Sequence, residues 1–313
     1  MLELLLLVIG FALLIKGADV FVNASVGIAK KLKIPTVIIG LTVVAMGTSA
    51  PEAVISITAS VQGANSLAIS NVVGSNIFNL LFIIGLCATI KAQKFNVRQI
   101  AKDFWFSIIG AVMLIGFKII GITYIPRWGS LILLLSFIVY LITLIRQAIK
   151  SQGLEKNVEK ETKKSRSLPV TILFTILGCG LIIVGGHLVV ESATELAIAI
   201  GITERIIGLT VVAIGTSLPE LVTSLVAFKK GENEFALGNI IGSNIFNIMF
   251  VLGVAGLISP LEFESALIVD TAFLILGSLI TLAFIYTRKR LARREGLIMA
   301  LIYLAYMIFI IMQ

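Results

Sequence analysis

The sequence has little charge, one histidine and two cysteines. Charged residues make up 13% of its 313 residues, about half the share found in soluble globular domains. Hydrophobic residues make up 58%, and the mean hydropathy is +1.08. These proportions argue against a soluble enzyme. They are typical of a protein that crosses the bilayer many times with helices that satisfy their own backbone hydrogen bonds.

The shortage of histidine and cysteine limits the kinds of metal site that the protein can form. Zinc and copper sites depend on imidazole and thiolate ligands, so no such site is expected. Cys87 and Cys179 have no disulfide or metal spacing and are expected to pack as small hydrophobic side chains. The net charge of +8 comes from basic residues that stand between apolar stretches. Membrane topology therefore explains them better than a nucleic-acid partner does.

Ten apolar stretches are bounded by charged residues, proline or glycine, and most have the length of about 20 residues that crosses a bilayer. We therefore expect an all-α polytopic membrane protein with ten transmembrane helices. The spans are expected at residues 2–30, 35–62, 67–90, 104–122, 128–149, 168–200, 205–230, 235–258, 267–286 and 297–311.

The two halves of the chain repeat each other. Residues 34–86 align with residues 202–254 without a gap, and 29 of the 53 aligned positions are identical, which indicates duplication of a five-helix unit. Because five is an odd number, the second copy must enter the membrane from the opposite side. Such inverted-topology repeats are common in secondary transporters. We expect a first repeat at 1–150 with its motif at 40–86, a connector at 151–167, and a second repeat at 168–313 with its motif at 208–254.

The distribution of lysine and arginine predicts the orientation. If the N-terminus is external, 21 of the 25 basic residues fall in the cytoplasmic loops and the connector, as the positive-inside rule requires. We therefore expect a multi-pass protein of the plasma membrane, with external N- and C-termini and a cytoplasmic central loop.

Each half carries an acid inside an apolar span, directly after a proline. The sequence Gly-Thr-Ser-Ala-Pro-Glu ends at Glu52, and Gly-Thr-Ser-Leu-Pro-Glu ends at Glu220. Proline lacks an N–H, and its ring displaces the carbonyl four residues back. Helices 2 and 7 should therefore be broken there, and the carbonyl oxygens so freed must line a cavity or meet a ligand.

Helical periodicity places further oxygen-bearing groups on the same faces as the two acids. They are Ala45, Thr48, Ser49, Ser56, Asn71, Ser75 and Asn79 in the first half, and Ala213, Thr216, Ser217, Ser224, Asn239, Ser243 and Asn247 in the second. Ligand sets made only of oxygen suit hard cations such as Ca²⁺ and Na⁺. Two intramembrane acids with no basic residue on these faces require a bound cation or a proton. The sequence thus predicts one cation site at mid-membrane depth.

A plainer interpretation is that each proline only kinks its helix and each acid only hydrogen-bonds a neighbouring helix. Two inverted copies with matching serines and asparagines make that interpretation weak. Asp19 and His187 also align across the repeat. For these two, a gating role and a simple hydrogen bond to a neighbouring helix or water both stay open.

The two Gly-Thr-Ser-x-Pro-Glu motifs, each followed by a Gly-Ser-Asn segment at 74–76 or 242–244, resemble the alpha repeats of the cation/calcium antiporter superfamily, in particular its prokaryotic sodium/calcium exchanger branch. The resemblance implies a Ca²⁺ site formed by Glu52 and Glu220 with the backbone carbonyls of Thr48 and Thr216. It implies Na⁺ positions formed by Ala45, Ser49, Ser75, Asn79, Ala213, Ser217, Ser243 and Asn247. It also implies that the first and sixth helices slide over a rigid remainder.

We therefore expect a secondary active antiporter that exchanges Na⁺ for Ca²⁺ by alternating access, with both ions as substrates and no resident cofactor. Proton/calcium antiport on the same fold is the alternative, although that branch typically carries Gly-Asn-x-x-Glu. A passive cation channel is weaker still, because the sequence has no wide polar stripe. Asn247 stands where potassium-dependent relatives carry aspartate, which argues against K⁺ co-transport. The expected surroundings are the lipid bilayer, with no nucleic acid and with function as a monomer.

Overall fold

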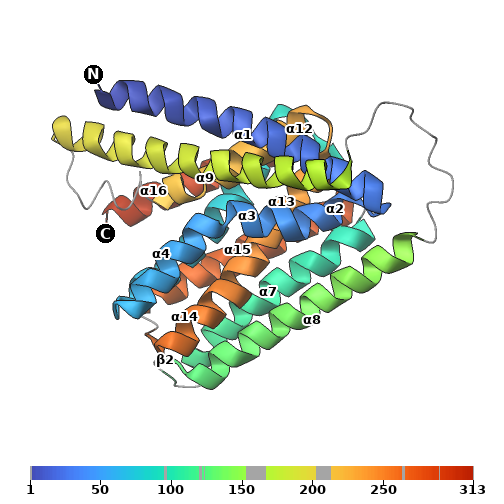
Figure 1. The fold of residues 1–313 in the computed structure, drawn as a ribbon. Helices are drawn as coiled ribbons and strands as arrows, with labels where there is room; N and C mark the ends of the chain where they lie inside the picture. The colour runs from blue at the N-terminus through green and yellow to red at the C-terminus, as the bar shows by residue number, and fades with distance from the viewer. Residues whose placement is uncertain are drawn as a thin grey trace.

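The computed structural model describes residues 2–94, 97–119, 122, 124–152, 167–201, 213–262, 265–288 and 290–312. Nearly all of them are helical (Figure 1). The first half consists of α1 (Leu2–Leu32), α2 (Thr36–Ile39), the π-helical η1 (Gly40–Val44), α3 (Ala45–Thr48), α4 (Ala50–Val61), α5 (Asn65–Ile77), the π-helical η2 (Phe78–Ile83), α6 (Ile84–Ile90), α7 (Val97–Ile119) and α8 (Arg127–Gln152).

The second half has the same order. It consists of α9 (Leu168–Ala199), α11 (Ala213–Thr216), α12 (Leu218–Lys229), α13 (Asn233–Ile245), the π-helical η4 (Phe246–Val251), α14 (Leu252–Ile258), α15 (Ser265–Arg288) and α16 (Arg293–Met312). The predicted start of the seventh span, residues 205–212, and most of the connector lie outside the described residues. So does the part of the second motif that begins at Gly208.

Seven helices in the described ranges are long and apolar enough to cross a membrane, and the bent pair Thr36–Thr48 with Ala50–Val61 makes an eighth span. The other two predicted spans contain α11 with α12, and α16. The all-α membrane fold is therefore confirmed, while the count of ten helices stays a prediction.

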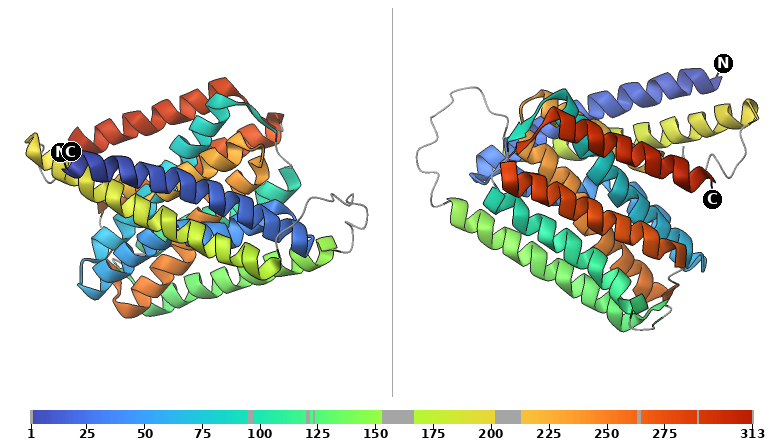
Figure 2. Two further views of the ribbon diagram at one scale, coloured as in Figure 1. Left: turned by 45° about the horizontal axis from the view of Figure 1, so that its top comes forward. Right: turned by 180° about the vertical axis from the view of Figure 1, so that it is seen from behind.

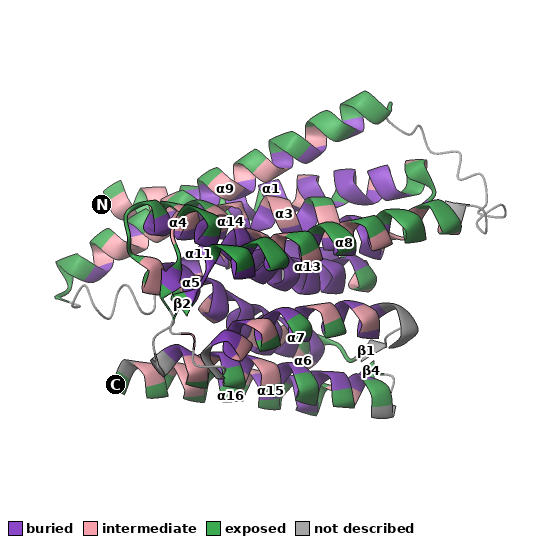
Figure 3. Cartoon of the chain, turned by 90° about the horizontal axis from the view of Figure 1, so that it is seen from below, coloured by how far each residue is buried: buried purple, intermediate pink, exposed green. Residues whose placement is uncertain are grey.

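The helices differ in how much they are covered by the rest of the protein. In the hydrophobic windows of the spans Asn65–Ile90 and Asn233–Ile258, 72% and 83% of the residues are buried, against 33% in α1 and 28% in α9. Figure 3 shows the same contrast, with buried residues along α13 and exposed ones on α8 and α16. The third and eighth spans thus form the centre of the protein, and the outer helices present apolar faces to lipid.

The helices α1 and α9 lie side by side and antiparallel across one face of the bundle (Figure 1). Small residues allow this contact: a Cβ added at Gly17 would lie 2.8 Å from Cβ of Leu181, and one at Gly10 would lie 3.0 Å from the carbonyl oxygen of Gly185. The helix η1 approaches α13 equally closely, because a Cβ at Gly40 would lie 2.5 Å from the carbonyl oxygen of Phe235. Backbone therefore packs on backbone where the two halves meet.

The breaks predicted at the prolines are present. The segment Thr36–Thr48 meets α4 at an angle of 51°, and Ser49 between them has non-helical dihedral angles. Ser217 separates α11 from α12 in the same way. Pro51 cannot donate to the carbonyl of Gly47, and that carbonyl instead accepts a hydrogen bond from the thiol of Cys179, with 3.6 Å between sulfur and oxygen.

Two short antiparallel strand pairs join the loops of the two halves, which the all-helical prediction did not include. The strand β1 (Gln93–Lys94) pairs with β4 (Arg290–Leu291), and β2 (Tyr124–Ile125) pairs with β3 (Leu261–Glu262). Each pair joins loops that the charge distribution places on one side of the membrane. In both views of Figure 2 the chain ends lie at one end of the molecule, whereas α8 ends and α9 begins at the other.

The fourth span begins earlier than residue 104, the boundary expected from the sequence. The helix α7 begins at Val97 instead, and Asp103 is only 2% exposed inside the bundle.

Candidate ion site at the helix breaks

The two acids of the repeats lie in one buried site. Ser49 of the first half donates a hydrogen bond to Oε1 of Glu220 at 2.7 Å, and Ser217 of the second half donates to Oε1 of Glu52 at 2.9 Å. Both acids are completely buried. Each break therefore supplies an acid to the site and a hydroxyl to the acid of the other half.

Ser243 on α13 connects the second acid to the first break. Its hydroxyl lies 3.3 Å from Oε1 of Glu220 and 3.5 Å from the carbonyl oxygen of Ala45. The same carbonyl accepts from the backbone N–H of Ser49 at 3.0 Å and from the hydroxyl of Thr48 at 3.4 Å. The carbonyl of Ala45 thus keeps its helical partner and also contacts Ser243, whereas the carbonyl freed by Pro51 is that of Gly47.

The remaining polar residues of the predicted faces also contact one another. Asn71 donates to the hydroxyl of Ser56 at 2.9 Å, and the equivalent Asn239 donates to Ser224 at 3.1 Å. The hydroxyl of Thr48 lies 3.1 Å from Oδ1 of Asn239. The two asparagine–serine bonds connect each broken helix to the central helix that follows it, and the Thr48 contact connects the first broken helix to α13 of the other half.

Four asparagines form a second contact between the halves, at the start of the π-helical segments. Asn76 and Asn244 each donate to the other's backbone carbonyl, at 3.0 and 3.2 Å. Asn79 donates to Oδ1 of Asn244 at 3.2 Å, and Asn247 donates to Oδ1 of Asn76 at 3.3 Å. All four are at most 3% exposed.

Several buried oxygen atoms at this site have no hydrogen-bond partner. They are Oε2 of Glu52, Oε2 of Glu220, Oγ of Ser75, Oδ1 of Asn79 and Oδ1 of Asn247. Unpaired buried polar atoms are rare and costly. The ion pairs seen within the described ranges, His187 with Glu191 and Lys230 with Asp19, do not involve either central acid. A set of carboxylate, hydroxyl and amide oxygens is suited to a hard cation.

Hydrogen bonds bring three of the predicted site residues, Ser49, Ser217 and Ser243, directly to the acids. The predicted site residues whose side chains are described are all buried: Glu52, Glu220, Thr48, Ser49, Ser75, Asn79, Thr216, Ser217, Ser243, Asn247 and Ala45. The backbone of Ala213 begins α11, but its side chain lies outside the described part of the structure. Sequence reasoning missed Asn76 and Asn244, which are off the predicted faces. Their presence in both copies of Gly-Ser-Asn-Ile-Phe-Asn was the available signal.

A cleft of about 350 Å³ reaches both helix breaks. It is lined by residues of the first break, by α9 including His187, and by Gly215, Thr216 and Pro219 of the second break. Its walls are mostly apolar. A second cleft, of about 440 Å³, lies beside α1 and is lined by Val22, Asn23, Val26, Gly27, Lys30, Lys230 and Glu232.

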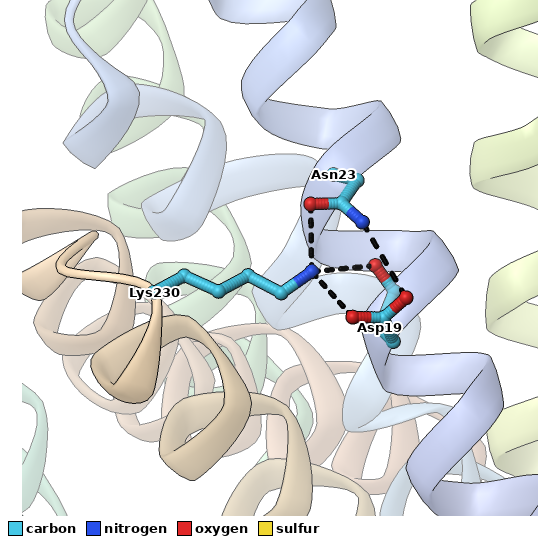
Figure 4. A network of polar contacts seen from close by, with 3 residues as sticks. All are labelled: Asp19, Asn23 and Lys230. Atoms are coloured by element: carbon cyan, nitrogen blue, oxygen red, sulfur yellow. Dashed lines mark hydrogen bonds and ion pairs between the residues drawn. The ribbon is translucent and has the colours of Figure 1, made fainter.

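Lys230 and Asn23, which line the second cleft, belong to a polar network that joins α1 to the end of α12 (Figure 4). Lys230 contacts Oδ1 of Asp19 at 2.6 Å, Oδ1 of Asn23 at 2.6 Å and the backbone carbonyl of Asp19 at 3.1 Å. Asp19 and Asn23 align with His187 and Glu191 of the second half, which lie 3.6 Å apart on α9 with largely exposed side chains. Within the described residues the two repeats therefore differ here, because Asp19 pairs with a lysine beyond its own helix whereas His187 pairs within its own helix.

A helical membrane bundle whose two halves each supply a buried acid to one shared oxygen site is a secondary ion transporter in class, not an enzyme. The chain belongs to the sodium/calcium exchanger protein family, whose model matches residues 2–146 and 170–312. This places it in the cation/calcium antiporter superfamily.

Individual relatives match along almost the whole chain. The sodium/calcium exchanger MaX1 of Methanosarcina acetivorans is 34% identical over 339 aligned positions, covering 97% of each chain. The inner membrane protein YrbG of Escherichia coli is 36% identical over 266 positions, covering 83% of this chain and 81% of its own. A structure of the sodium-calcium exchanger NCX_Mj soaked with 10 mM Na⁺ and no Ca²⁺ superimposes with a TM-score of 0.83 at 33% identity, covering 97% of each chain. The chain is thus a multi-pass membrane protein of the cation/Ca²⁺ exchanger class.

Proposed function

We propose that the protein is an antiporter that exchanges Na⁺ for Ca²⁺. The observation that carries the proposal is the pair of unpaired oxygens, Oε2 of Glu52 and Oε2 of Glu220, in a buried site without a basic partner among the described residues. Two carboxylates supply two negative charges, which match one Ca²⁺ or two monovalent cations. Competition of the two ions for one site is what exchange requires.

In this proposal Ca²⁺ is bound by Glu52 and Glu220 with the backbone carbonyls of Thr48 and Thr216. The Na⁺ positions around it use Ala45, Ser49, Ser75 and Asn79 from the first half, and Ala213, Ser217, Ser243 and Asn247 from the second. The unpaired oxygens of Ser75, Asn79 and Asn247 support this assignment, because a cation would supply the interactions that these buried atoms otherwise lack.

Alternating access supplies the transport cycle. The repeats, at 1–150 and 168–313 around a connector at 151–167, would present the site to each side in turn, with α1 and α9 moving over the rest. The close backbone contact between α1 and α9 at their glycines supports movement of these two helices together as one unit. The protein would act as a monomer, with external termini and a cytoplasmic connector. The 350 Å³ cleft lies along the half of α9 nearer the termini and would then open to the outside.

The test is Ca²⁺ uptake by proteoliposomes of the purified protein under one imposed gradient at a time. We expect uptake with a Na⁺ gradient and none with a K⁺ or H⁺ gradient alone. Uptake driven by a pH gradient in sodium-free medium would replace Na⁺ by H⁺ as the coupling ion, which two buried acids would also permit. Uptake that needs no counter-ion would indicate a channel.

A further inference from the structure

The cross-bonded pair Asn76 and Asn244 lies behind the proposed ligands Asn79 and Asn247. An amide side chain is ambiguous as a cation ligand, since one end carries an oxygen and the other an NH₂ group that repels cations. Which end faces the site depends on the hydrogen bonds made by the other end. The direction of those bonds can be followed from the backbone.

A backbone carbonyl can only accept a hydrogen bond. The carbonyl of Asn76 therefore draws the NH₂ group of Asn244 toward it, at 3.2 Å. The oxygen of Asn244 then faces Asn79, which must donate its own NH₂ group, at 3.2 Å. Oδ1 of Asn79 is left without a partner on the other side of the amide.

The equivalent chain of bonds starts in the other half. The carbonyl of Asn244 accepts from the NH₂ group of Asn76 at 3.0 Å, and Oδ1 of Asn76 accepts from the NH₂ group of Asn247 at 3.3 Å. Oδ1 of Asn247 is the unpaired atom. Two independent chains of bonds therefore end in the same result, a buried amide oxygen with no protein partner.

We propose that Asn76 and Asn244 are positioning residues that turn the side-chain oxygens of Asn247 and Asn79, respectively, toward the transported cation. The pairing crosses between the repeats, so that each half orients a ligand of the other. This inference rests on the proposed function for the identity of the cation. It requires no direct contact of Asn76 or Asn244 with the ion.

The inference is tested by double-mutant cycles, because a residue that acts through another loses its effect when that other is removed. We expect Asn76→Ala and Asn247→Ala each to raise the half-saturating Na⁺ concentration by about 10- to 100-fold, as loss of a partner that orients a ligand does. The double variant should be no worse than Asn247→Ala alone. In contrast, Asn76→Ala combined with Asn79→Ala should multiply the two effects. Asn244→Ala should couple to Asn79→Ala and not to Asn247→Ala.

Two measurements separate positioning from a general folding role. Na⁺-dependent stabilisation of the purified protein against heating, in NaCl against choline chloride, reports Na⁺ binding without transport. Exchange of Ca²⁺ for labelled Ca²⁺ in sodium-free medium depends on Ca²⁺ binding by the acids and on the conformational change, but not on Na⁺ binding. The rate of this exchange should fall less than threefold in Asn76→Ala. Leucine, which has the same number and branching of side-chain heavy atoms as asparagine, is tested in parallel in case alanine leaves a damaging cavity.

Asn65→Ala is the matched control. Asn65 lies on α5, as Asn76 does, and its side chain donates a hydrogen bond to Ser259 of the other half at 3.1 Å, away from the acids. It should leave the half-saturating Na⁺ concentration unchanged. If the wild-type protein responds to Na⁺ and the effects of Asn76→Ala and Asn247→Ala on the half-saturating Na⁺ concentration multiply in the double variant, the positioning role is overturned. Absence of any Na⁺ response in the wild-type protein would instead overturn the proposed function.

Discussion

Ser49 and Glu220 are 171 positions apart in the sequence and share a hydrogen bond of 2.7 Å between hydroxyl and carboxylate. The equivalent bond from Ser217 to Glu52 crosses 165 positions at 2.9 Å. Each proline-containing break thus orients the acid of the opposite half. Each acid also keeps its second carboxylate oxygen unpaired. Neither half would form this site alone.

Removal of either serine hydroxyl should weaken ion binding without removing a charge. We expect Ser49→Ala and Ser217→Ala each to raise the half-saturating Ca²⁺ concentration by about 10- to 100-fold, the usual cost of losing a partner that orients a ligand. Initial rates of Ca²⁺ uptake over a range of Ca²⁺ concentrations measure it. Ser136→Ala is the control, because Ser136 on α8 bonds only to a carbonyl of its own helix, and it should behave as wild type.

Removal of either acid should reduce Ca²⁺ transport more than removal of a serine hydroxyl does. Glu52→Gln and Glu220→Gln each remove one of the two negative charges, so we expect Ca²⁺ uptake to fall by more than about 100-fold, beyond the cost of losing an orienting partner. The amide keeps the shape of the side chain, and the protein should still be purified in folded form. Uptake within threefold of wild type in either variant would contradict the assignment of that acid as a ligand.

The contact of Asp19 with Lys230 should affect the position of α1 more than it affects the free energy of unfolding. Asp19 is 51% exposed at its side chain, and ion pairs of this kind contribute about 0–1 kcal/mol to stability. Lys230→Gln should leave the melting temperature within a degree or two, yet free α1 from the end of α12. The rate at which a water-soluble thiol reagent labels a cysteine placed at Val26, in a variant lacking Cys87 and Cys179, should then rise.

Asp19→Asn should raise that labelling rate by a similar factor. Combining it with Lys230→Gln should add little, because both changes break one contact. Equal labelling in all variants would mean that the ion pair does not hold this cleft closed.

The outer helices contain an internally repeated contact of aspartate with tyrosine and phenylalanine. Tyr140 donates to Asp103 at 3.3 Å and packs against Phe106, and Tyr306 donates to Asp270 at 2.9 Å and packs against Phe273. Tyr140→Phe keeps the ring contact and removes the donor to a buried carboxyl group. Such a loss costs about 1–3 kcal/mol.

We therefore expect Tyr140→Phe to lower the thermal unfolding temperature by a few degrees while transport per folded molecule stays unchanged. Tyr303→Phe removes a hydroxyl outside these pairs and serves as the control for loss of a phenol. A change in ion affinity in Tyr140→Phe would show that this contact reaches the ion site.

The membrane class, the repeat and the acids were predictable because each depends on local sequence. Low charge excludes a water-soluble core, apolar length sets the spans, and proline forces the breaks. Glu52 and Glu220 could be paired in advance because a duplicated motif in inverted orientation places its two copies at the same depth. The start of α7 was placed too late, because the hydropathy of its first turn resembles that of a loop although the backbone is already helical at Val97.

The sequence by itself determined that the chain lies in a bilayer, that it is built twice, and that two acids need a cation or a proton. Only the tertiary structure decided which oxygens are turned toward that ion and which are held by neighbours. The choice depends on hydrogen bonds between residues some 165 to 171 positions apart. No local pattern encodes the direction of such bonds, because the partners belong to the opposite repeat: carboxylates for the serines, and backbone carbonyls that orient the asparagines.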